Sequence, residues 1–410
     1  MGLQPAGRFG GSRWAEMQPC RRARYSGFMQ PPFFSSLRPD RASGASQRSM
    51  VLARRGAIAT SQPLASDAGL AVLRDGGNAI DAAIAAVAVL GVVEPYNTGI
   101  GGDCFALVWS AGEQRLFGFN GSGRSPRAAS ADSVRGPTTG EMPAQGVDTV
   151  TVPGAVDAWC RLLDRFGSRS LADVLAPAIE LAREGFAVSE VVAHEWNLVV
   201  AFDFLRNRAA RECFAPGGEA PRLGSVVRFP DLARSLSLLA DGGRDVFYRG
   251  ELAEQMLDML RAEGGVFTAE DFATAAGQWV DPISLDYRGY ELCELPPNTQ
   301  GISALIALGI LRHLDTGIWS PGSVETTHLL IEAVKLALAD RDAHVADPHT
   351  MQTTVEALLD DAELRRLAAR IDPRRAASTV EARVRPGSDC LLYTSPRPRD
   401  KRQTRMPSSA

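Results

Sequence analysis

The sequence of 410 residues is poor in the patterns that mark metal-binding and redox proteins. Its six cysteines include no Cys-X-X-Cys pair, so neither a structural zinc site nor a dithiol redox centre is expected. We expect reduced, mostly buried thiols instead, as in other large chains with widely spaced cysteines. The cysteines are Cys20, Cys104, Cys160, Cys213, Cys293 and Cys390.

Membrane and nucleic-acid binding are also poorly supported. No apolar run reaches the roughly 20 residues that a membrane-spanning helix needs. The segment from Ala79 to Val93 is apolar on nearly all sides but too short, which is typical of a helix buried in a protein core. A formal net charge of −4 indicates no general affinity for nucleic acid or anionic membranes. The composition is therefore that of an ordinary globular protein.

Nucleotide- and metal-binding motifs are missing as well. The glycine-rich loop from Thr98 to Asp103 is not followed by Gly-Lys-Ser or Gly-Lys-Thr, and it lacks the glycine spacing of dinucleotide-binding folds. The five histidines show no His-Glu-X-X-His spacing. We therefore expect no cofactor and no metal ion. The loop itself predicts a tight turn, either beside a substrate pocket or purely structural.

The two ends differ in composition from the region between them. Residues 1–49 are rich in Pro, Gly, Ser and Arg and contain no apolar core of a secretory signal, so we expect a disordered or leader segment. The missing secretory signal favours a cytoplasmic protein. A periplasmic or secreted location is one alternative, and a transit peptide at residues 1–49 is another. Residues 390–410 resemble translated sequencing-adapter sequence and predict a disordered, non-native tail. A native basic tail is the alternative.

The segment from Thr60 to Pro126 has the clearest secondary-structure pattern. A helix is expected from Ser66 to Asp75, and an apolar helix follows with Asn78 as its N-cap. Alternating strands from Cys104 to Ser110 and from Leu116 to Asn120 predict a β-hairpin.

Downstream, helical and strand patterns alternate without an internal repeat. Helices are expected at Ala155–Phe166, Ser170–Glu184, Asp231–Asp241, Glu251–Glu263, Thr268–Phe272, Ile302–Leu314 and Ser323–Asp340. Strands are expected at Val51–Ala53, Ala57–Thr60, Thr149–Val152 and within Pro282–Leu295.

Seven short motifs follow one another between residues 50 and 389. They are the block at 60–126, TVPG at 151–154, LAPAI with GF at 175–186, GRDVFYRG at 243–250, DYRGY at 286–290, LPPNTQG at 295–301, and a helix with His328, Glu332, Lys335 and Arg341. Each motif is weak alone, but their order resembles the γ-glutamyltranspeptidase family of N-terminal-nucleophile hydrolases. The resemblance implies an α/β fold over residues 50–389, the large-subunit portion of a four-layer αββα sandwich.

The resemblance also implies a mechanism. Proenzymes of this family cut themselves before a threonine, whose hydroxyl then attacks the amide while its own α-amine, with a pKa of about 8, serves as base. That threonine is expected directly after Asp389, where this sequence has Cys390. We expect Cys390 to be foreign sequence and the chain to stop before the nucleophile and the small subunit of the same proenzyme. A complete enzyme that uses Cys390 as its nucleophile is the alternative.

The expected acyl-binding position departs from the family pattern. Aligned on Phe119, Asn120 stands where γ-glutamyl transferases have the arginine that binds the α-carboxylate of the substrate. Arg124 could supply a guanidinium from another position, or could be a structural hydrogen-bonding residue. The NGSGR segment resembles the acylase-like or oxamate-amidohydrolase-like branch. Asn120 and Arg124 are therefore the candidate substrate-binding residues.

The sequence thus predicts a fragment of a γ-glutamyltransferase- or γ-glutamyl-hydrolase-like proenzyme, inactive as it stands. Its substrate would be a small-molecule amide or γ-glutamyl compound. An acylase- or oxamate-amidohydrolase-like member of the family is one alternative, and a non-catalytic ligand-binding or scaffold protein is another. On the long helix after Ser323, Glu332, Lys335 and Arg341 are expected to form a solvated, salt-bridged face rather than catalytic groups.

Overall fold

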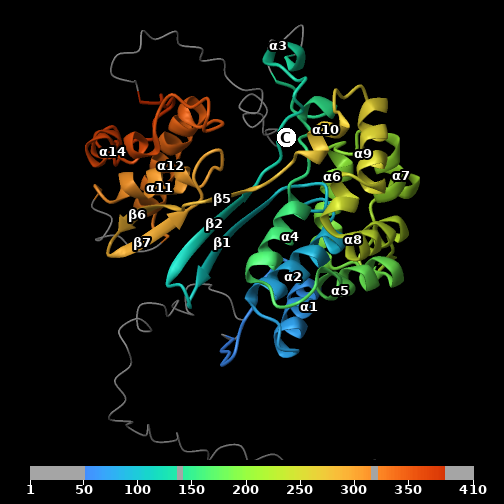
Figure 1. The fold of residues 1–410 in the computed structure, drawn as a ribbon. Coiled ribbons are helices and arrows are strands. Elements are labelled where there is room, and N and C mark those ends of the chain that lie inside the picture. Colours follow the sequence, from blue (N-terminus) through green and yellow to red (C-terminus); the bar gives the residue numbers. More distant parts are fainter. Residues whose placement is uncertain (1–50, 136–141, 315–321, 384–410) are drawn as a thin grey trace, which may run out of the picture. The chain divides into compact units, whose positions relative to one another are not determined.

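The computed structural model describes residues 51–135, 142–314 and 322–383 as a mixed helix and strand protein (Figure 1). Residues from Gly56 onward form one compact unit, and residues 51–55 belong to another. The expected leader at 1–49 and tail at 390–410 lie outside the described residues. In the part that is described, no helix is long and apolar enough to cross a membrane.

The elements follow one another in mixed order. The helices are α1 (Pro63–Arg74), α2 (Ala79–Val93), α3 (Ala131–Val134), α4 (Ala155–Phe166), α5 (Leu171–Glu184), α6 (Glu190–Ala201), α7 (Arg208–Phe214), α8 (Pro230–Tyr248), α9 (Glu251–Ala262), α10 (Ala269–Ala273), α11 (Ile302–Leu311), α12 (Val324–His344), α13 (Val355–Leu358) and α14 (Asp361–Ala368). The strands are β1 (Cys104–Ser110), β2 (Arg115–Gly121), β3 (Phe186–Ala187), β4 (Val226–Val227), β5 (Gln278–Val280), β6 (Ile283–Tyr287) and β7 (Tyr290–Glu294).

Helix α2 forms the centre of the larger core, as its apolar sequence predicts. The Asn78 side chain accepts hydrogen bonds from Ile80 N and Asp81 N, and the Asp81 carboxylate accepts one from Asn78 N at 2.8 Å. This reciprocal capping satisfies amide groups that a helix start otherwise leaves unpaired. The predicted N-cap is therefore confirmed, and α2 packs against α1, α4 and α5.

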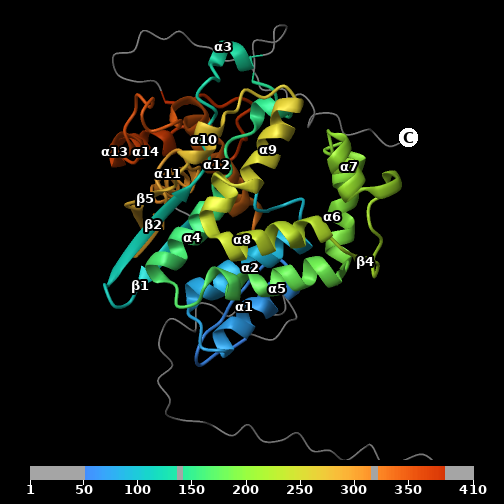
Figure 2. The same ribbon diagram turned by 45° about the vertical axis from the view of Figure 1, so that its right-hand side comes forward.

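The main sheet has three antiparallel strands in the order β1-β2-β5. The predicted hairpin is confirmed, with Cys104 opposite Gly121 and Ser110 opposite Arg115. Helix α4 packs against β1 and β2 and covers one face of this sheet (Figures 1 and 2). The other face exposes every second residue of β1, a row formed by Phe105, Leu107 and Trp109.

A smaller core lies around the hairpin β6-β7 and helices α11, α12 and α14. Buried polar groups on α12 hold the segment 372–383, which has no helix or strand of its own. Asp340 is fully buried and accepts hydrogen bonds from Arg383 N at 2.8 Å and Arg383 Nε at 2.7 Å. Nearer the start of α12, Lys335 Nζ donates to Glu332 at 2.8 Å and to the carbonyl of Ala377 at 2.6 Å. The long helix is therefore a support for the chain that follows it.

Three expectations about local structure are wrong. Residues 51–60 contain no strand, and no strand forms at 149–152, where a short 3₁₀ turn at Val147–Thr149 leads into extended chain. The helix expected to end at Asp241 does break close to that point, since Gly243 has φ 61° and ψ −153°. A further helical stretch, which the sequence did not predict, then runs to Tyr248. The glycine pair therefore marks the break in helical geometry that the sequence indicated.

The described cysteines are free, and they are less buried than expected. Cys104, Cys160 and Cys293 are half-buried, and Cys213 is exposed. Burial, together with the nearby Asp103 carboxylate, raises the pKa of the Cys104 thiol to about 11. Burial likewise raises the pKa of the Cys160 thiol to about 11, with Asp164 adding to the effect.

These thiols should therefore react slowly with iodoacetamide. At pH 8, a thiol with a pKa near 11 has on the order of one molecule in a thousand as thiolate, the nucleophilic form. We expect Cys104 and Cys160 to be labelled at least tenfold more slowly than the exposed Cys213. Peptide mass spectrometry over a time course measures this, and raising the pH to 10 should narrow the difference. Equal labelling of Cys160 and Cys213 at pH 8 would contradict it.

Candidate active site

Asn120 occupies the end of β2, next to the point where the strand leaves the sheet. It is 8% exposed, and its neighbour Phe119 is fully buried on the opposite face, toward α4. Asn120 therefore lies on the same face of the sheet as Phe105, its register partner on β1. The sequence placed this residue at an acyl-binding position, and the structure places it on the face that the helices leave uncovered.

The Asn120 side chain is fixed by a polar cluster from two distant segments. Asn120 Nδ2 donates to Asn298 Oδ1 at 2.8 Å, and Asn120 Oδ1 accepts from Ser122 N at 3.0 Å and Ser122 Oγ at 2.7 Å. Asn298 Nδ2 donates to Ser122 Oγ at 3.0 Å, which closes the ring of contacts. Two of the seven motifs, NGSGR and LPPNTQG, thus meet at one point although 178 residues separate the two asparagines.

The backbone after Asn120 runs in close contact with the TVPG turn. A Cβ atom on Gly154 would lie 1.9 Å from the carbonyl oxygen of Gly121, and one on Gly123 would lie 1.8 Å from that of Val152. Only glycine allows two main chains to approach so closely. The carbonyl of Gly102, in the predicted glycine loop, accepts hydrogen bonds from Gly154 N at 2.9 Å and from Ala155 N at 3.0 Å. The loop therefore supports the start of α4.

The LPPNTQG turn is also tied to α12. Arg341 Nη1 donates to Gln300 Oε1 at 2.7 Å, and Arg341 also pairs with Asp342 at 2.7 Å. The expected ion pairing on this helix is confirmed, but the expected solvated face is wrong for Glu332, which is only 4% exposed. Its carboxylate is buried because it accepts hydrogen bonds from Lys335 and from the amide of Ala377.

The other candidate residues lie differently. Arg124 is exposed, and its guanidinium makes no hydrogen bond or ion pair with another described residue. Its carbonyl accepts from Val152 N at 2.9 Å, which holds the backbone but leaves the side chain free to turn toward a ligand. Cys390, the residue at the expected nucleophile position, lies outside the described residues. Among the residues that are described, no group of His, Cys, Asp and Glu is arranged to hold a metal ion.

The cluster is electrically neutral. Asn120 and Asn298 each keep one amide hydrogen that their mutual contacts do not use, so the two can donate hydrogen bonds to a carbonyl or carboxylate oxygen. The cluster itself supplies no charge.

The described residues thus form a helix layer on one face of an antiparallel sheet, with polar motif residues on the other. Solved structures of N-terminal-nucleophile hydrolases have the same arrangement. A cephalosporin acylase from Bacillus halodurans shares this architecture at 41% identity and a TM-score of 0.72, over 80% of this chain and 63% of that one. The family model for gamma-glutamyltranspeptidase matches residues 65–404, and the chain belongs to this family. The predicted family and fold class are confirmed.

Two curated relatives show the range of names in the family. A glutathione hydrolase-like proenzyme of Bacillus subtilis, YwrD, is 40% identical over 75% of this chain and 58% of its own length. An oxamate amidohydrolase proenzyme of Klebsiella pneumoniae is 36% identical over 77% of this chain and 60% of its own. The chain thus spans about three fifths of the length of the curated relatives it matches.

Sequence reasoning named Asn120 as a candidate but did not identify the residues that its side chain contacts. Asn298 and Ser122 lie within motifs that were noted, yet nothing in the sequence indicates that their side chains meet. The sequence shows only that each of the two motifs contains short polar residues, which does not predict a contact between them. The same is true of Gln300 and Arg341, which lie in two family motifs and form a hydrogen bond that the sequence did not predict.

Proposed function

We propose that the chain is the large-subunit portion of a proenzyme that hydrolyses an amide or transfers its acyl group. The nucleophile would be the N-terminal residue of a small subunit released by self-cleavage. The observation that carries this proposal is the cluster of Asn120, Ser122 and Asn298, which joins two family motifs on the uncovered face of the sheet. The curated relatives, which are named as hydrolase and amidohydrolase proenzymes, support the same reaction class.

The small subunit is the proposed partner, and the uncovered face of the sheet is where we expect it to pack. Phe105, Leu107 and Trp109 are 43%, 41% and 58% exposed and form a continuous apolar row on β1. Large side chains in such a row usually mark an interface. β1 is also an edge strand of the β1-β2-β5 sheet. In an αββα sandwich, a second sheet covers this face, and Asn120 would then lie between the two sheets.

The neutral cluster favours the acylase-like alternative within this family. A γ-glutamyl substrate carries an α-carboxylate, which proteins usually bind with a paired guanidinium. Asn120 can donate a hydrogen bond but supplies no positive charge. A neutral acyl group fits the described cluster without further help, whereas a γ-glutamyl or oxamate-like substrate would depend on Arg124.

The test is a proenzyme in which residues 1–389 are followed by the small subunit that the downstream DNA encodes, or by that of the B. subtilis relative. We expect self-cleavage into two subunits and release of p-nitroaniline from butyryl-p-nitroanilide at a rate comparable to that from γ-glutamyl-p-nitroanilide. Asn120→Ala should lower kcat/KM about tenfold or more for both substrates, because a hydrogen bond to the acyl group is lost. Arg124→Gln should affect only the γ-glutamyl substrate.

The outcomes separate the alternatives. A cleaved protein that hydrolyses neither anilide, or an Asn120→Ala variant with unchanged kcat/KM, would contradict the proposed site. The chain as given serves as the control, and we expect an intact mass and no turnover. If it instead cleaves before Cys390 and loses amidase activity in Cys390→Ala, then Cys390 is the nucleophile and no further subunit is needed.

A further inference from the structure

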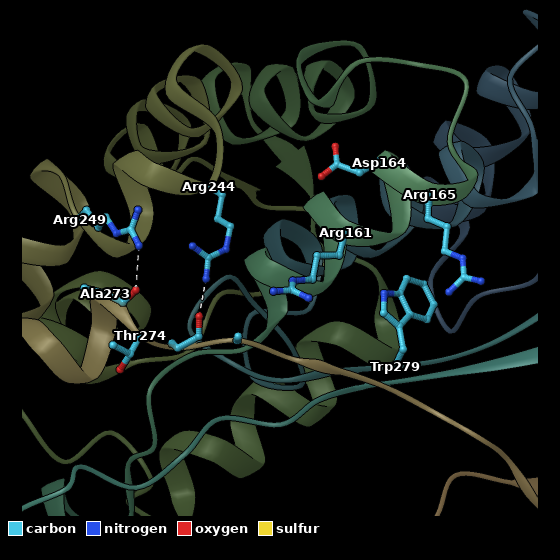
Figure 3. A pocket seen from close by; sticks show the side chains of 10 residues that line it. Arg161, Asp164, Arg165, Arg244, Arg249, Ala273, Thr274 and Trp279 are labelled. Atoms are coloured by element: carbon cyan, nitrogen blue, oxygen red, sulfur yellow. Dashed lines mark hydrogen bonds between the residues drawn. The ribbon is translucent and has the colours of Figure 1, made fainter.

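A pocket of about 670 Å³ lies among α4, the last turn of α8 and the segment that leads from α10 into β5. Four arginines line it, Arg161, Arg165, Arg244 and Arg249, against a single lining carboxylate, that of Asp164. Figure 3 shows Arg161 and Arg244 extending into the same space from different helices. The volume is within the range of small-molecule sites, which is about 300–1,000 Å³.

A buried carboxylate behind the pocket orients two of these arginines. Asp157 is 1% exposed and accepts hydrogen bonds from Arg161 Nε at 3.2 Å, from Arg244 Nε, and from the amide of Gly277 at 2.7 Å. One carboxylate thus balances two guanidinium groups, and one positive charge remains. Arg244 also donates to the carbonyl of Ala275, whereas the terminal nitrogens of Arg161 make no hydrogen bond with any described residue. The N–H groups of these terminal nitrogens face the pocket, and the bond from Nε to Asp157 holds the guanidinium in this orientation.

The remaining arginines and the aromatic wall add to the site. The Arg165 guanidinium stacks on Trp279, 4.5 Å from the ring centroid, and forms no ion pair within the described part of the chain. Arg249 pairs with Asp245 at 3.4 Å at the other end of the pocket. The positive charge is therefore concentrated at Arg161, Arg244 and Arg165.

This pocket is separate from the candidate active site. In the register of β2 with β5, Trp279 lies opposite Phe119, and Gln278 lies opposite Asn120. Adjacent residues of a strand point to opposite faces. Trp279 and the pocket are therefore on the face that α4 covers, and Asn120 is on the other. A molecule in the pocket cannot be the acyl group bound at Asn120.

We propose that this pocket binds a small phosphorylated metabolite, with its phosphate held between Arg161 and Arg244. A planar guanidinium presents paired N–H donors that match phosphate oxygens, and such charge-assisted bonds are strong because both partners are ionised. The volume leaves room for more than a single phosphate group beside Trp279. The kinked helix α8 contributes to this geometry, because Arg244 directly follows the break at Gly243.

The test is calorimetric titration of the full chain with inorganic phosphate and with pyrophosphate, at constant ionic strength set with KCl. We expect saturable binding of pyrophosphate, tighter than that of phosphate. Arg161→Gln should weaken it by about tenfold or more, since a charged hydrogen bond pair is lost while Asp157 keeps Arg244. Arg161→Lys, which keeps the charge but not the paired donors, should weaken it less. Arg208→Gln removes an equally charged side chain, 90% exposed on α7, and should change nothing.

Several results would overturn the proposal. They are no saturable binding of either probe at 10 mM, equal affinity in Arg161→Gln and wild type, or equal losses in Arg161→Gln and Arg208→Gln. Tight binding of citrate with none of pyrophosphate would assign the pocket to carboxylates instead. The thermal midpoints of unliganded variants establish that each is folded. Because no amide turnover is measured, the result is independent of the proposed enzyme activity.

Discussion

Replacing Asp340 by alanine is expected to lower the free energy of unfolding by about 3–5 kcal/mol, the usual cost of removing one partner of a buried ion pair. Asp340 is fully buried on α12, and Arg383 Nη2 lies 2.6 Å from its Oδ2, with the Arg383 side chain only 10% exposed. Without the carboxylate, the guanidinium is left with the carbonyl of Ala357 at 3.2 Å. The uncompensated charge, rather than the lost contact, accounts for most of the expected loss.

Chemical denaturation measures the loss, and hydrogen exchange locates it. We expect faster exchange of the Arg383 amide and of the segment 377–383, because Asp340 also accepts the hydrogen bond from Arg383 N. Asp258→Asn, an exposed carboxylate on α9, is the control and should stay within about 0.5 kcal/mol of wild type. A loss below 1 kcal/mol in Asp340→Ala would show that Arg383 turns to solvent at little cost.

Asp157→Ala should be the second most damaging substitution, at about 3 kcal/mol. It removes the acceptor of Gly277 N and leaves two guanidinium groups facing each other, with Arg244 24% and Arg161 38% exposed. Because both arginines retain some contact with solvent, the loss should be smaller than at Asp340. The repulsion should also disturb the start of β5, which follows Gly277 directly.

Asp164→Asn is a matched control for this prediction. Asp164 is on the same helix and lines the same pocket, but it is exposed. We expect its free energy of unfolding to stay within about 0.5 kcal/mol of wild type. Urea denaturation of both variants measures the free energy of unfolding. Similar losses in the two would mean that the buried contacts of Asp157 add no more stability than an exposed carboxylate does. Added KCl should partly restore Asp157→Ala, since salt screens the remaining repulsion between arginines.

The sequence was informative wherever structure depends on neighbours along the chain. The capping of α2 by Asn78 and the bounds of β1 follow from residues within a few positions, and both predictions are confirmed. The strand expected at 149–152 was wrong because apolar alternation alone does not supply a partner strand. The family resemblance makes Asn120 a candidate acyl-binding residue, which stays a prediction, and the structure shows that its side chain contacts Asn298 and Ser122.

The features that the sequence did not predict depend on contacts between distant segments. Asn298 reaches Asn120 only through the fold, and the arginine pocket is assembled from α4, α8 and the segment before β5. Periodicity could not indicate that Glu332 is buried, because a glutamate on a helix is usually exposed. Its burial depends on a distant segment, from which Ala377 N donates to its carboxylate. Such arrangements require the three-dimensional structure.

The close main-chain contact at Gly121 and Gly154 has a consequence for which substitutions this chain can accept. A Cβ atom at position 154 would lie 1.9 Å from the carbonyl oxygen of Gly121, so any side chain there must push β2 away from the start of α4. The Asn120 side chain acts on the same stretch, because its Oδ1 accepts the hydrogen bond from Ser122 N at 3.0 Å. A change at position 120 is therefore expected to alter the chain that follows β2 as well as the polar cluster.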